Sequence, residues 1–453
     1  MTVTSVQDDT NYYFGIWIWD LFGYLILDIG YWIFVYNTLM SMKRKVIMNT
    51  AVQFGGRLLT SFIGFVVTVL LARYLGAQGY GIYSKIYALA SFFYLVADFG
   101  LNAVYIREYK NDLQFFSLLN TLRTLFFTLS LTLIGIFFLV TGNRIFSDNW
   151  EKLAVLLFSP TILFFGYYTS LNAIFQIHLR YELSVLAAII GGIVGLGLVL
   201  VSLPYGLSVI ICALVVGYAV TVIIAYCLAR RIATFHFFPS LKRLYDPMYK
   251  KQALTFLRTS APLGVMLFFN TMYARADVFV LSAYTTNAQV GIYQLAYKFF
   301  EFPLAFAAFF ANAVFPHYVT LYAQSREHFW HVFRRATAAL AIISVVFTMG
   351  AWFGAPLLAY VKSDYALSAR PLQILSLSYP IFFLTSALSW LAFLQGKEKQ
   401  LVWIYGTSFL INIASNIIFV PHYSYIASSW ITVAGEIGVL LMLAWVIQVQ
   451  NEK

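Results

Sequence analysis

The sequence has few charged residues, only two cysteines and none of the short motifs that mark common enzyme sites. Charged residues make up 10% of its 453 positions, against about 25% in a water-soluble domain, while 61% are hydrophobic. Cys212 and Cys227 lie 15 positions apart in one apolar stretch, which is too far for a disulfide. There is no Walker lysine loop, HExxH helix, Cys/His cluster or Ser-His-Asp order. These absences exclude a water-soluble protein, and they predict no catalytic residue, no metal site, no cofactor and no use of ATP.

Long apolar stretches dominate the chain instead. A helix that crosses a bilayer needs about 20 consecutive apolar residues, and roughly twelve such stretches can be marked. They are expected at 46–72, 82–106, 113–141, 152–177, 183–203, 206–229, 255–283, 290–315, 332–361, 368–395, 400–420 and 424–448. The loops between them leave no room for a folded soluble domain of about 100 residues. The sequence therefore predicts an all-α integral membrane protein with about twelve transmembrane helices.

The predicted spans form two groups of six, separated by the longest polar segment of the chain. We expect a first six-helix bundle in 42–229, a basic cytoplasmic linker in 230–254 and a second six-helix bundle in 255–453. Residues 1–41 form a hydrophobic N-terminal extension, for which three alternatives stay open. The extension is an additional span, a helix lying in the membrane interface, or an upstream addition to a chain whose functional start is Met42.

The excess of positive charge has a topological explanation. The net charge is +11, from 29 Lys and Arg against 18 Asp and Glu. With the basic residues 43–45 in the cytoplasm and each span reversing direction, 19 of the 29 cationic residues lie in or beside inner loops. Cytoplasmic loops of membrane proteins collect Lys and Arg. We therefore expect both ends of the helical core in the cytoplasm, and no nucleic-acid partner.

The two halves carry an internal repeat. Residues 81–104 and residues 291–314 are offset by 210 positions and share 10 identities in 24 positions, with Gly-Ile-Tyr at the start and Asn-Ala-Val at the end. A duplicated unit of six spans crosses the membrane in the same direction both times, so the expected pseudo-twofold axis runs along the membrane normal. Two such bundles facing one central cavity are typical of a transporter.

Nine ionisable side chains fall inside the predicted spans that follow the N-terminal extension. Each costs at least about 2.5–3.5 kcal/mol in hydrocarbon, so it is expected to face a cavity or a partner. Lys85 lies near a span end and is expected to extend to the membrane interface. Lys298 and Glu301 share a helix face and can neutralise one another. Arg275 and Asp277 are two positions apart, so only one of them can face the cavity squarely, and the other is expected to brace a neighbouring helix.

The basic residues inside the spans suit an anionic substrate, because the planar guanidinium of arginine matches the oxygens of a phosphate group. The predicted substrate-binding residues are Arg57, Arg123, Arg275 and Lys298. The acidic residues suit either coupling to a cation or charge balance, and both alternatives stay open. These acidic residues are Asp98, Asp277, Glu301 and Glu436.

Several motifs, in one order along the chain, resemble those of the O-antigen and other polysaccharide repeat-unit flippases. The first is Leu-Leu-Ala-Arg-Tyr-Leu-Gly at 70–76, followed by Gln-Gly-Tyr-Gly-Ile-Tyr at 78–83. Later ones are Arg-Ala-Asp at 275–277, Val-Gly-Ile-Tyr at 290–293, Ala-Tyr-Lys at 296–298, Phe-Pro at 315–316, Pro-Leu-Gln-Ile-Leu at 371–375 and Ala-Gly-Glu at 434–436. The resemblance covers about residues 46–448 and is to Wzx-type members of the multidrug/oligosaccharidyl-lipid/polysaccharide exporter superfamily.

This resemblance implies a transporter and not an enzyme. Such flippases carry a polyprenyl-pyrophosphate-linked sugar repeat from the inner to the outer leaflet of the cell membrane, by alternating access of two six-helix bundles. The implied partners are the lipid-linked oligosaccharide, membrane lipids, and a polysaccharide polymerase and glycosyltransferases. A pyrophosphate with attached sugars needs a wet cavity with central cations. Our hypothesis is that Arg57 and Arg275, on the first spans of the two bundles, hold the diphosphate.

Three rival functions stay open. A cation-coupled multidrug exporter of the same superfamily would favour an acidic cavity, whereas the spans here hold five basic and four acidic residues. About fourteen spans would favour a flippase for the peptidoglycan lipid precursor, and the roughly twelve marked here do not. A membrane-embedded glycan polymerase or ligase would carry a large catalytic outer loop, and the predicted outer loops are short.

Overall fold

The computed structural model describes residues 42–109, 112 and 115–448. The N-terminal extension 1–41, with its three alternatives, lies outside the described residues. The chain divides into two compact units, Met1–Gln53 and Phe54–Lys453. Only the beginning of the first described helix belongs to the smaller unit, and every other described element lies in the larger one.

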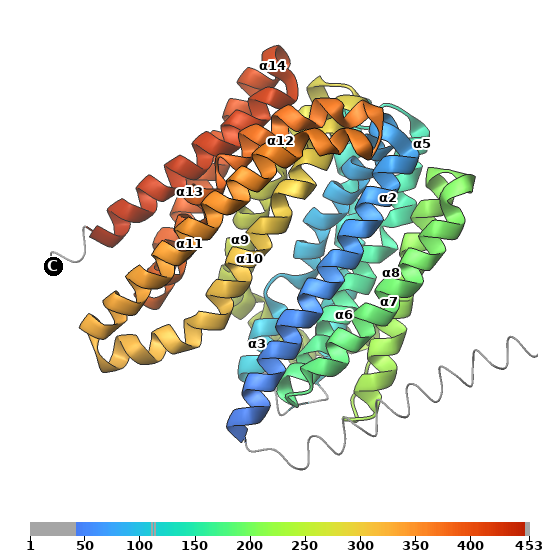
Figure 1. Cartoon of the computed structure of the whole chain (residues 1–453). Helices are drawn as coiled ribbons and strands as arrows, with labels where there is room; N and C mark the ends of the chain where they lie inside the picture. Colours follow the sequence, from blue (N-terminus) through green and yellow to red (C-terminus); the bar gives the residue numbers. More distant parts are fainter. Residues whose placement is uncertain (1–41, 110–111, 113–114, 449–453) are drawn as a thin grey trace, which may run out of the picture. The chain divides into compact units, whose positions relative to one another are not determined.

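Every regular element of the described residues is a helix (Figure 1). The first half of the chain contains α2 (Met42–Asp98), α3 (Leu101–Glu108), α4 (Phe115–Thr141), α5 (Asn149–Phe158), α6 (Pro160–Ile177), α7 (Tyr181–Ser202) and α8 (Leu207–Arg230). The second half contains α9 (Pro247–Tyr284), α10 (Asn287–Gln324), α11 (Arg326–Gly354), α12 (Ala369–Ser376), α13 (Tyr379–Leu394) and α14 (Glu398–Gln448). Short 3-10 helices are η1 (Leu203–Tyr205), η2 (Leu241–Tyr245), η3 (Ala355–Tyr360) and η4 (Ser363–Ser368).

The helices have the length and composition of membrane spans. Within the described part, seven of them are long and apolar enough to cross a membrane, and the number is nine if each of two bent helix pairs is one span. Every predicted span coincides with helix, and α2 and α14 each extend through two predicted spans. α10 is not among the nine candidate membrane spans of the described part. The all-α membrane fold is therefore confirmed. The count of twelve spans and the division into bundles 42–229 and 255–453 stay predictions.

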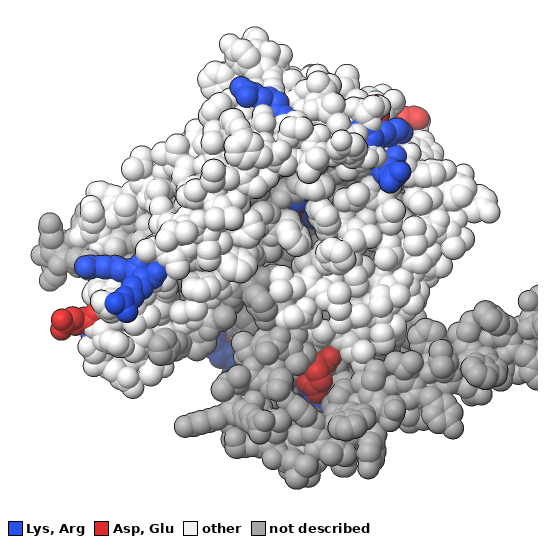
Figure 2. Space-filling model, in the orientation of Figure 1, with Lys and Arg blue, Asp and Glu red and all other residues white. Residues whose placement is uncertain are grey.

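The surface of the larger unit suits a lipid environment. Large apolar side chains are exposed along its helices, among them Leu139 at 84%, Phe353 at 74% and Trp403 at 77%. On the face shown in Figure 2, Lys, Arg, Asp and Glu side chains occupy few places among uncharged ones. Extended apolar surface of this kind marks contact with a membrane.

Two breaks let the longest helices reverse direction. Gly76 divides α2 with a φ of 68°, a left-handed conformation that glycine adopts without steric cost. A Cβ there would lie 2.9 Å from Lys362 Nζ, so the end of that flexible side chain would have to move. Ser424 divides α14 with a φ of 54°, shortly after Pro421, which interrupts helical hydrogen bonding. The predicted loops inside these two helices are therefore reduced to tight turns.

The internal repeat corresponds to a reciprocal helix crossing between α2 and α10. A Cβ on Gly81 would lie 1.8 Å from the carbonyl oxygen of Asn287, and one on Gly291 would lie 2.0 Å from that of Ala77. Both pairs of positions are related by the repeat offset of 210. Only residues without a side chain let two helix backbones approach so closely. The repeated glycine therefore sets the distance between the two sequence halves at this crossing.

Polar and apolar contacts reinforce the crossing. The Tyr365 hydroxyl donates to the carbonyl oxygen of Ala72 at 3.2 Å, and the Ala77 amide donates to Asp364 Oδ2 at 3.5 Å. A buried apolar cluster at the same place draws side chains from α2, α8, α10 and α12. The turn end of α2 is thus packed against the second half of the chain.

We expect Gly291→Ala to destabilise the protein, because its methyl group would meet a backbone oxygen that cannot turn aside. Overpacking of this kind costs about 1–3 kcal/mol. The midpoint of thermal unfolding of the detergent-purified protein, followed by intrinsic fluorescence, should therefore fall. The matched control is Gly135→Ala in α4, where a Cβ would meet nothing within 4 Å. Its midpoint should stay unchanged or rise, because alanine favours a helix. Equal midpoints for the two variants would contradict the close crossing.

Candidate functional site

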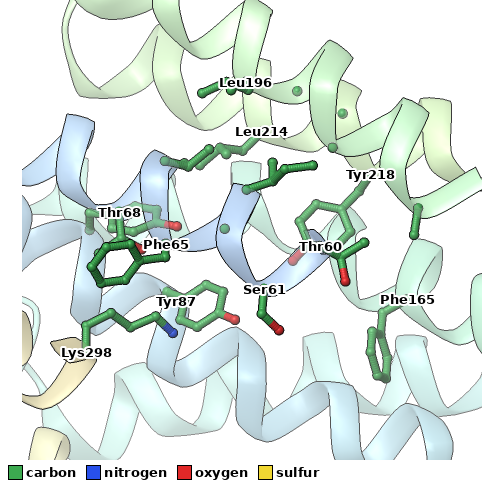
Figure 3. Close-up of a pocket in the computed structure, with 18 of the residues that line it drawn as sticks. Thr60, Ser61, Phe65, Thr68, Tyr87, Phe165, Leu196, Leu214, Tyr218 and Lys298 are labelled. Carbon is green, nitrogen blue, oxygen red and sulfur yellow. The ribbon is translucent and has the colours of Figure 1, made fainter. Parts of the chain in front are cut away.

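A cavity of about 650 Å³ lies between the two sequence halves (Figure 3). α2 and α5 to α8 line it from the first half, and α9 and α10 line it from the second. Its volume falls within the range of ligand pockets, about 300–1,000 Å³. Among its described lining, the charged residues are Arg275, Lys298 and Glu301. The remaining polar side chains of that lining carry hydroxyl groups, apart from the amide of Gln294.

α10 presents one face to this cavity. Its lining residues are Gln294, Lys298, Glu301, Phe302 and Ala305. Their spacing of three or four positions follows the helical repeat of 3.6 residues. This face begins about one turn after the crossing at Gly291. The close crossing with α2 therefore brings the charged turn of α10 against the cavity.

Glu301 bridges the two cations of the cavity. Its Oε1 lies 3.0 Å from Arg275 Nη2 and its Oε2 lies 3.1 Å from Lys298 Nζ. The i, i+3 pairing expected from the spacing is present. The three side chains are between 19% and 31% exposed, so they still face open space. One carboxylate against two cations leaves the cavity with a net charge of +1.

Asp277 does not line the cavity. It is buried, accepts a hydrogen bond from the hydroxyl of Tyr293 on α10, and accepts another from the Val278 amide at 2.8 Å. Of the two charged neighbours on α9, Arg275 therefore faces the cavity and Asp277 braces α10. This is the arrangement that their spacing of two positions predicts.

Arg123 is fully buried on α4 and lies outside the cavity lining. Its Nη2 donates to Asp98 Oδ1 at 3.2 Å and to Asn102 Oδ1 at 2.9 Å. Its Nη1 donates to the Ala97 carbonyl oxygen at 3.4 Å and to the Thr169 hydroxyl. The guanidinium thus holds the residues on either side of the break between α2 and α3. This geometry fits a structural role for Arg123 and Asp98.

The expectation that Lys85 extends to the membrane interface is wrong. Lys85 is 1% exposed, and its Nζ donates to Glu151 Oε2 and to the Ile145 carbonyl oxygen, both at 2.8 Å. Ile145 lies in the segment before α5 and Glu151 lies on α5, and together they supply the partners of Lys85 without any need for water. Glu151 also accepts from Asn287 Nδ2 at 3.0 Å, so the pair reaches the second half.

Arg57 is exposed, does not line the cavity and makes no ion pair with a described residue. It precedes Thr60 and Ser61, which do line the cavity, by about one helical turn of α2. The structure therefore brings Arg275 and Lys298 together with Glu301, and leaves Arg57 and Arg123 outside that group.

Glu436 on α14 is buried at 4% exposure without a cationic partner among the described residues. The Tyr273 hydroxyl donates to its Oε1 at 3.0 Å, and Thr385 Oγ1 lies 3.3 Å from its Oε2. Gly435 leaves space for the tyrosine, since a Cβ there would lie 3.0 Å from the Tyr273 hydroxyl. No group of three or more His, Cys, Asp or Glu side chains in the described part could hold a metal ion.

Sequence patterns offer no means of selecting the hydroxyl and aromatic residues of the cavity. Aromatic residues make up 19% of the chain, so composition does not separate those that line a cavity from those that face lipid. Those that line the cavity include Tyr80, Tyr83, Tyr87, Tyr168 and Tyr218, together with Thr60, Ser61, Thr68, Ser84 and Thr221. The only sequence signal is that Tyr83 and Tyr87 both recur in the repeat, at 293 and 297.

Residues 46–322, more than half of the chain, match the family model described as polysaccharide biosynthesis protein. The chain belongs to this family. Residues 262–418 also match the MatE model. The families concerned are transporters and flippases, not enzymes. The candidate spans agree with this family, and the chain is a multi-pass membrane protein. No curated protein matches the sequence.

Solved structures share the fold at low sequence identity. The lipid II flippase MurJ in an inward closed conformation has a TM-score of 0.68 at 18% identity, covering 89% of this chain and 87% of that chain. A multidrug resistance MATE family transporter in an inward-facing conformation has a TM-score of 0.61 at 15% identity, covering 86% and 93%. A transporter from Pyrococcus furiosus has a TM-score of 0.54 at 15% identity, covering 89% and 94%. The last two belong by title to the MOP superfamily.

We expect Arg123→Gln to lower stability in this flippase-like fold, because it removes a fully buried cation from Asp98 and Asn102. Asp98 is 25% exposed, so the loss should be smaller than the cost of about 3–5 kcal/mol for a fully buried pair. The thermal midpoint of the purified variant should fall clearly. Arg107→Gln is the matched control, since Arg107 is 68% exposed and its pair with Glu108 is worth about 0–1 kcal/mol. An unchanged midpoint for Arg123→Gln, combined with lost transport, would show instead that Arg123 contacts the substrate.

Proposed function

We propose that the protein is a flippase that moves a polyprenyl-pyrophosphate-linked oligosaccharide, a polysaccharide or O-antigen repeat unit, from the inner to the outer leaflet. The observation that carries the proposal is the cavity whose described lining has two cations, one carboxylate, and hydroxyl groups among aromatic and aliphatic side chains. A diphosphate needs cations, and the attached sugars need hydrogen-bonding groups. Membership of the polysaccharide biosynthesis family supports the same substrate class.

We assign the diphosphate to Arg275 and Lys298. Glu301 gives one oxygen to each cation, at 3.0 and 3.1 Å, which is how a bridging phosphate group would contact them. The carboxylate thus takes the position between the two cations that a substrate phosphate would occupy, and it reduces the cost of two neighbouring cations. A diphosphate carries more negative charge than one carboxylate, so it can displace Glu301 from both. Arg57, at the edge of the cavity, is not part of this assignment.

The proposed transport cycle follows from the two-bundle prediction. Bundles 42–229 and 255–453 would expose the cavity alternately to the two sides of the inner membrane, with both ends of the helical core and the linker 230–254 in the cytoplasm. The isoprenoid tail stays in lipid while the diphosphate and sugars pass through the cavity. Glycosyltransferases would assemble the lipid-linked glycan before transport, and a polysaccharide polymerase would use it afterwards. We therefore propose these enzymes as cellular partners.

Glu436 supports a second candidate, a cation-coupled multidrug exporter, and the MatE match over 262–418 points the same way. The single hydroxyl hydrogen of Thr385 has two acceptors in reach, the Phe382 carbonyl oxygen at 3.0 Å and Glu436 Oε2 at 3.3 Å. When the carbonyl takes that hydrogen, Glu436 completes the second bond only as a protonated acid. We propose Glu436 for coupling, and Asp98, Asp277 and Glu301 for charge balance.

Reconstitution in proteoliposomes with a fluorescent polyprenyl-pyrophosphate oligosaccharide tests the proposal. We expect the labelled glycan to reach the opposite leaflet, and Arg275→Gln and Lys298→Gln each to slow this transfer at least about tenfold, because a hydrogen bond to a charged group is worth about 1.5–3 kcal/mol. Arg57→Gln, which removes a cation outside the cavity lining, should transfer at the native rate.

Two results would contradict the flippase. One is normal transfer by both cavity variants. The other is no transfer of the glycan lipid, in a preparation that moves cationic dyes against a proton or sodium gradient and loses this movement in Glu436→Gln. The second result would establish the drug exporter.

A further inference from the structure

Three tyrosines of α2 form a continuous aromatic surface on the cavity. Tyr80, Tyr83 and Tyr87 are one helical turn apart, and all three line the cavity. The ring centroids of Tyr83 and Tyr87 are 6.1 Å apart with an interplanar angle of 28°, and those of Tyr80 and Tyr83 are 6.1 Å apart at 35°. The rings thus lie roughly parallel along about two turns of the helix.

This surface continues directly from the charged group of the cavity. Lys298 reaches toward Tyr87 in Figure 3. Tyr218, on α8, lines another wall of the same cavity. Ser61 and Thr60 place further hydroxyl groups along α2. The cationic part of the cavity lining, at Lys298, is therefore followed directly by a part that carries aromatic rings and hydroxyl groups.

The chemistry of this wall suits a sugar better than an apolar drug or a lipid tail. A sugar ring has an apolar C–H face and a rim of hydroxyl groups. A tyrosine ring offers the matching apolar face and a polar end, and serine and threonine hydroxyls both donate and accept. The hydroxyl groups of Thr60, Thr221 and Tyr168 already donate to backbone carbonyl oxygens. Their oxygens can still accept hydrogen bonds from the hydroxyl groups of a sugar.

The order of the groups also matches the order of bonds in the proposed substrate. In a polyprenyl-pyrophosphate-linked glycan the first sugar is bonded directly to the diphosphate. With the diphosphate at Arg275 and Lys298, the first sugars fall next to Tyr87 and the following ones toward Tyr83. Gly191 and Gly195 on α7 and Gly217 on α8 also line the cavity. The positions of their missing Cβ atoms face the contact between α7 and α8, so these glycines let the two helices of that wall pack closely.

We propose that Tyr83 and Tyr87 are the sugar-binding wall of the cavity and determine specificity for glycosylated over sugar-free polyprenyl pyrophosphates. This inference rests on the proposed flippase function. Stacking on the ring faces supplies the specificity, and the tyrosine hydroxyl groups add to it.

The test compares two fluorescent lipids in the same proteoliposome assay, polyprenyl pyrophosphate with an oligosaccharide and polyprenyl pyrophosphate without sugar. Tyr83→Leu/Tyr87→Leu should lower the ratio of glycan-lipid to sugar-free transfer by about tenfold, given the strength of aromatic contacts. Tyr83→Phe/Tyr87→Phe should keep most of the native ratio. The control is Tyr74→Leu, on the same helix but 47% exposed and outside the cavity lining; its ratio should equal the native one.

A ratio cancels differences in the amount of folded protein, so partial misfolding of a variant does not mimic the effect. A second measurement needs no substitution. It is saturation-transfer NMR on the free oligosaccharide with the native protein in detergent, and we expect the sugar C–H protons to receive saturation from aromatic protons of the protein.

The outcomes separate the two levels of the proposal. Equal losses for both lipids, or absence of saturation transfer, would overturn the sugar-binding wall while leaving the diphosphate flippase standing. A phenylalanine variant as impaired as the leucine variant would overturn stacking as the source of specificity. Failure of the native protein to transfer either lipid would overturn the proposed function, and the sugar-binding wall with it.

Discussion

The cost of placing charge in hydrocarbon governs how this protein is built. At about 2.5–3.5 kcal/mol or more for each ionisable group at mid-depth, a charge needs a partner or a wet cavity. The described part contains both solutions. Lys85 with Glu151 is a buried pair, and Arg123 is a buried cation that pairs with the partly exposed Asp98; both pairs tie segments of the chain together. The group of Arg275, Glu301 and Lys298 instead lines the cavity with all three side chains partly exposed.

The two halves of the chain contribute different chemistry to the cavity. α9 and α10 supply its charges, whereas α2 and α5 to α8 supply aromatic rings, hydroxyl groups and glycines. What brings them together is the reciprocal crossing at Gly81 and Gly291, one of the few features that the repeat has kept identical in both halves. After this crossing α10 turns one face to the cavity for about three turns. The features shared by the two copies of the repeat thus hold the helices together. The residues that differ between the copies make one side of the cavity charged and the other uncharged.

Local and periodic features could be predicted from the sequence, whereas long-range partners could not. Apolar stretches located the helices, and the offset of 210 marked the repeat whose glycines meet at the crossing. Spacing of three or two positions anticipated the Lys298 pair with Glu301 and the opposite directions of Arg275 and Asp277. Lys85 was misplaced because its partner Glu151 is 66 positions away. Arg123 looked like a ligand for phosphate because nothing in the sequence placed Asp98 and Asn102 beside it. Tyr83 and Tyr87 were hidden among many other aromatic residues that face lipid.

The most direct test of the central claim, that an anionic lipid headgroup enters this cavity at two cations held by one carboxylate, is electron cryo-microscopy of the protein in lipid nanodiscs with a polyprenyl-pyrophosphate glycan. We expect diphosphate density between the Arg275 guanidinium and the Lys298 ammonium, with Glu301 turned away from both. A bound lipid whose diphosphate lies elsewhere, with the contacts of 3.0 and 3.1 Å to Glu301 intact, would contradict it.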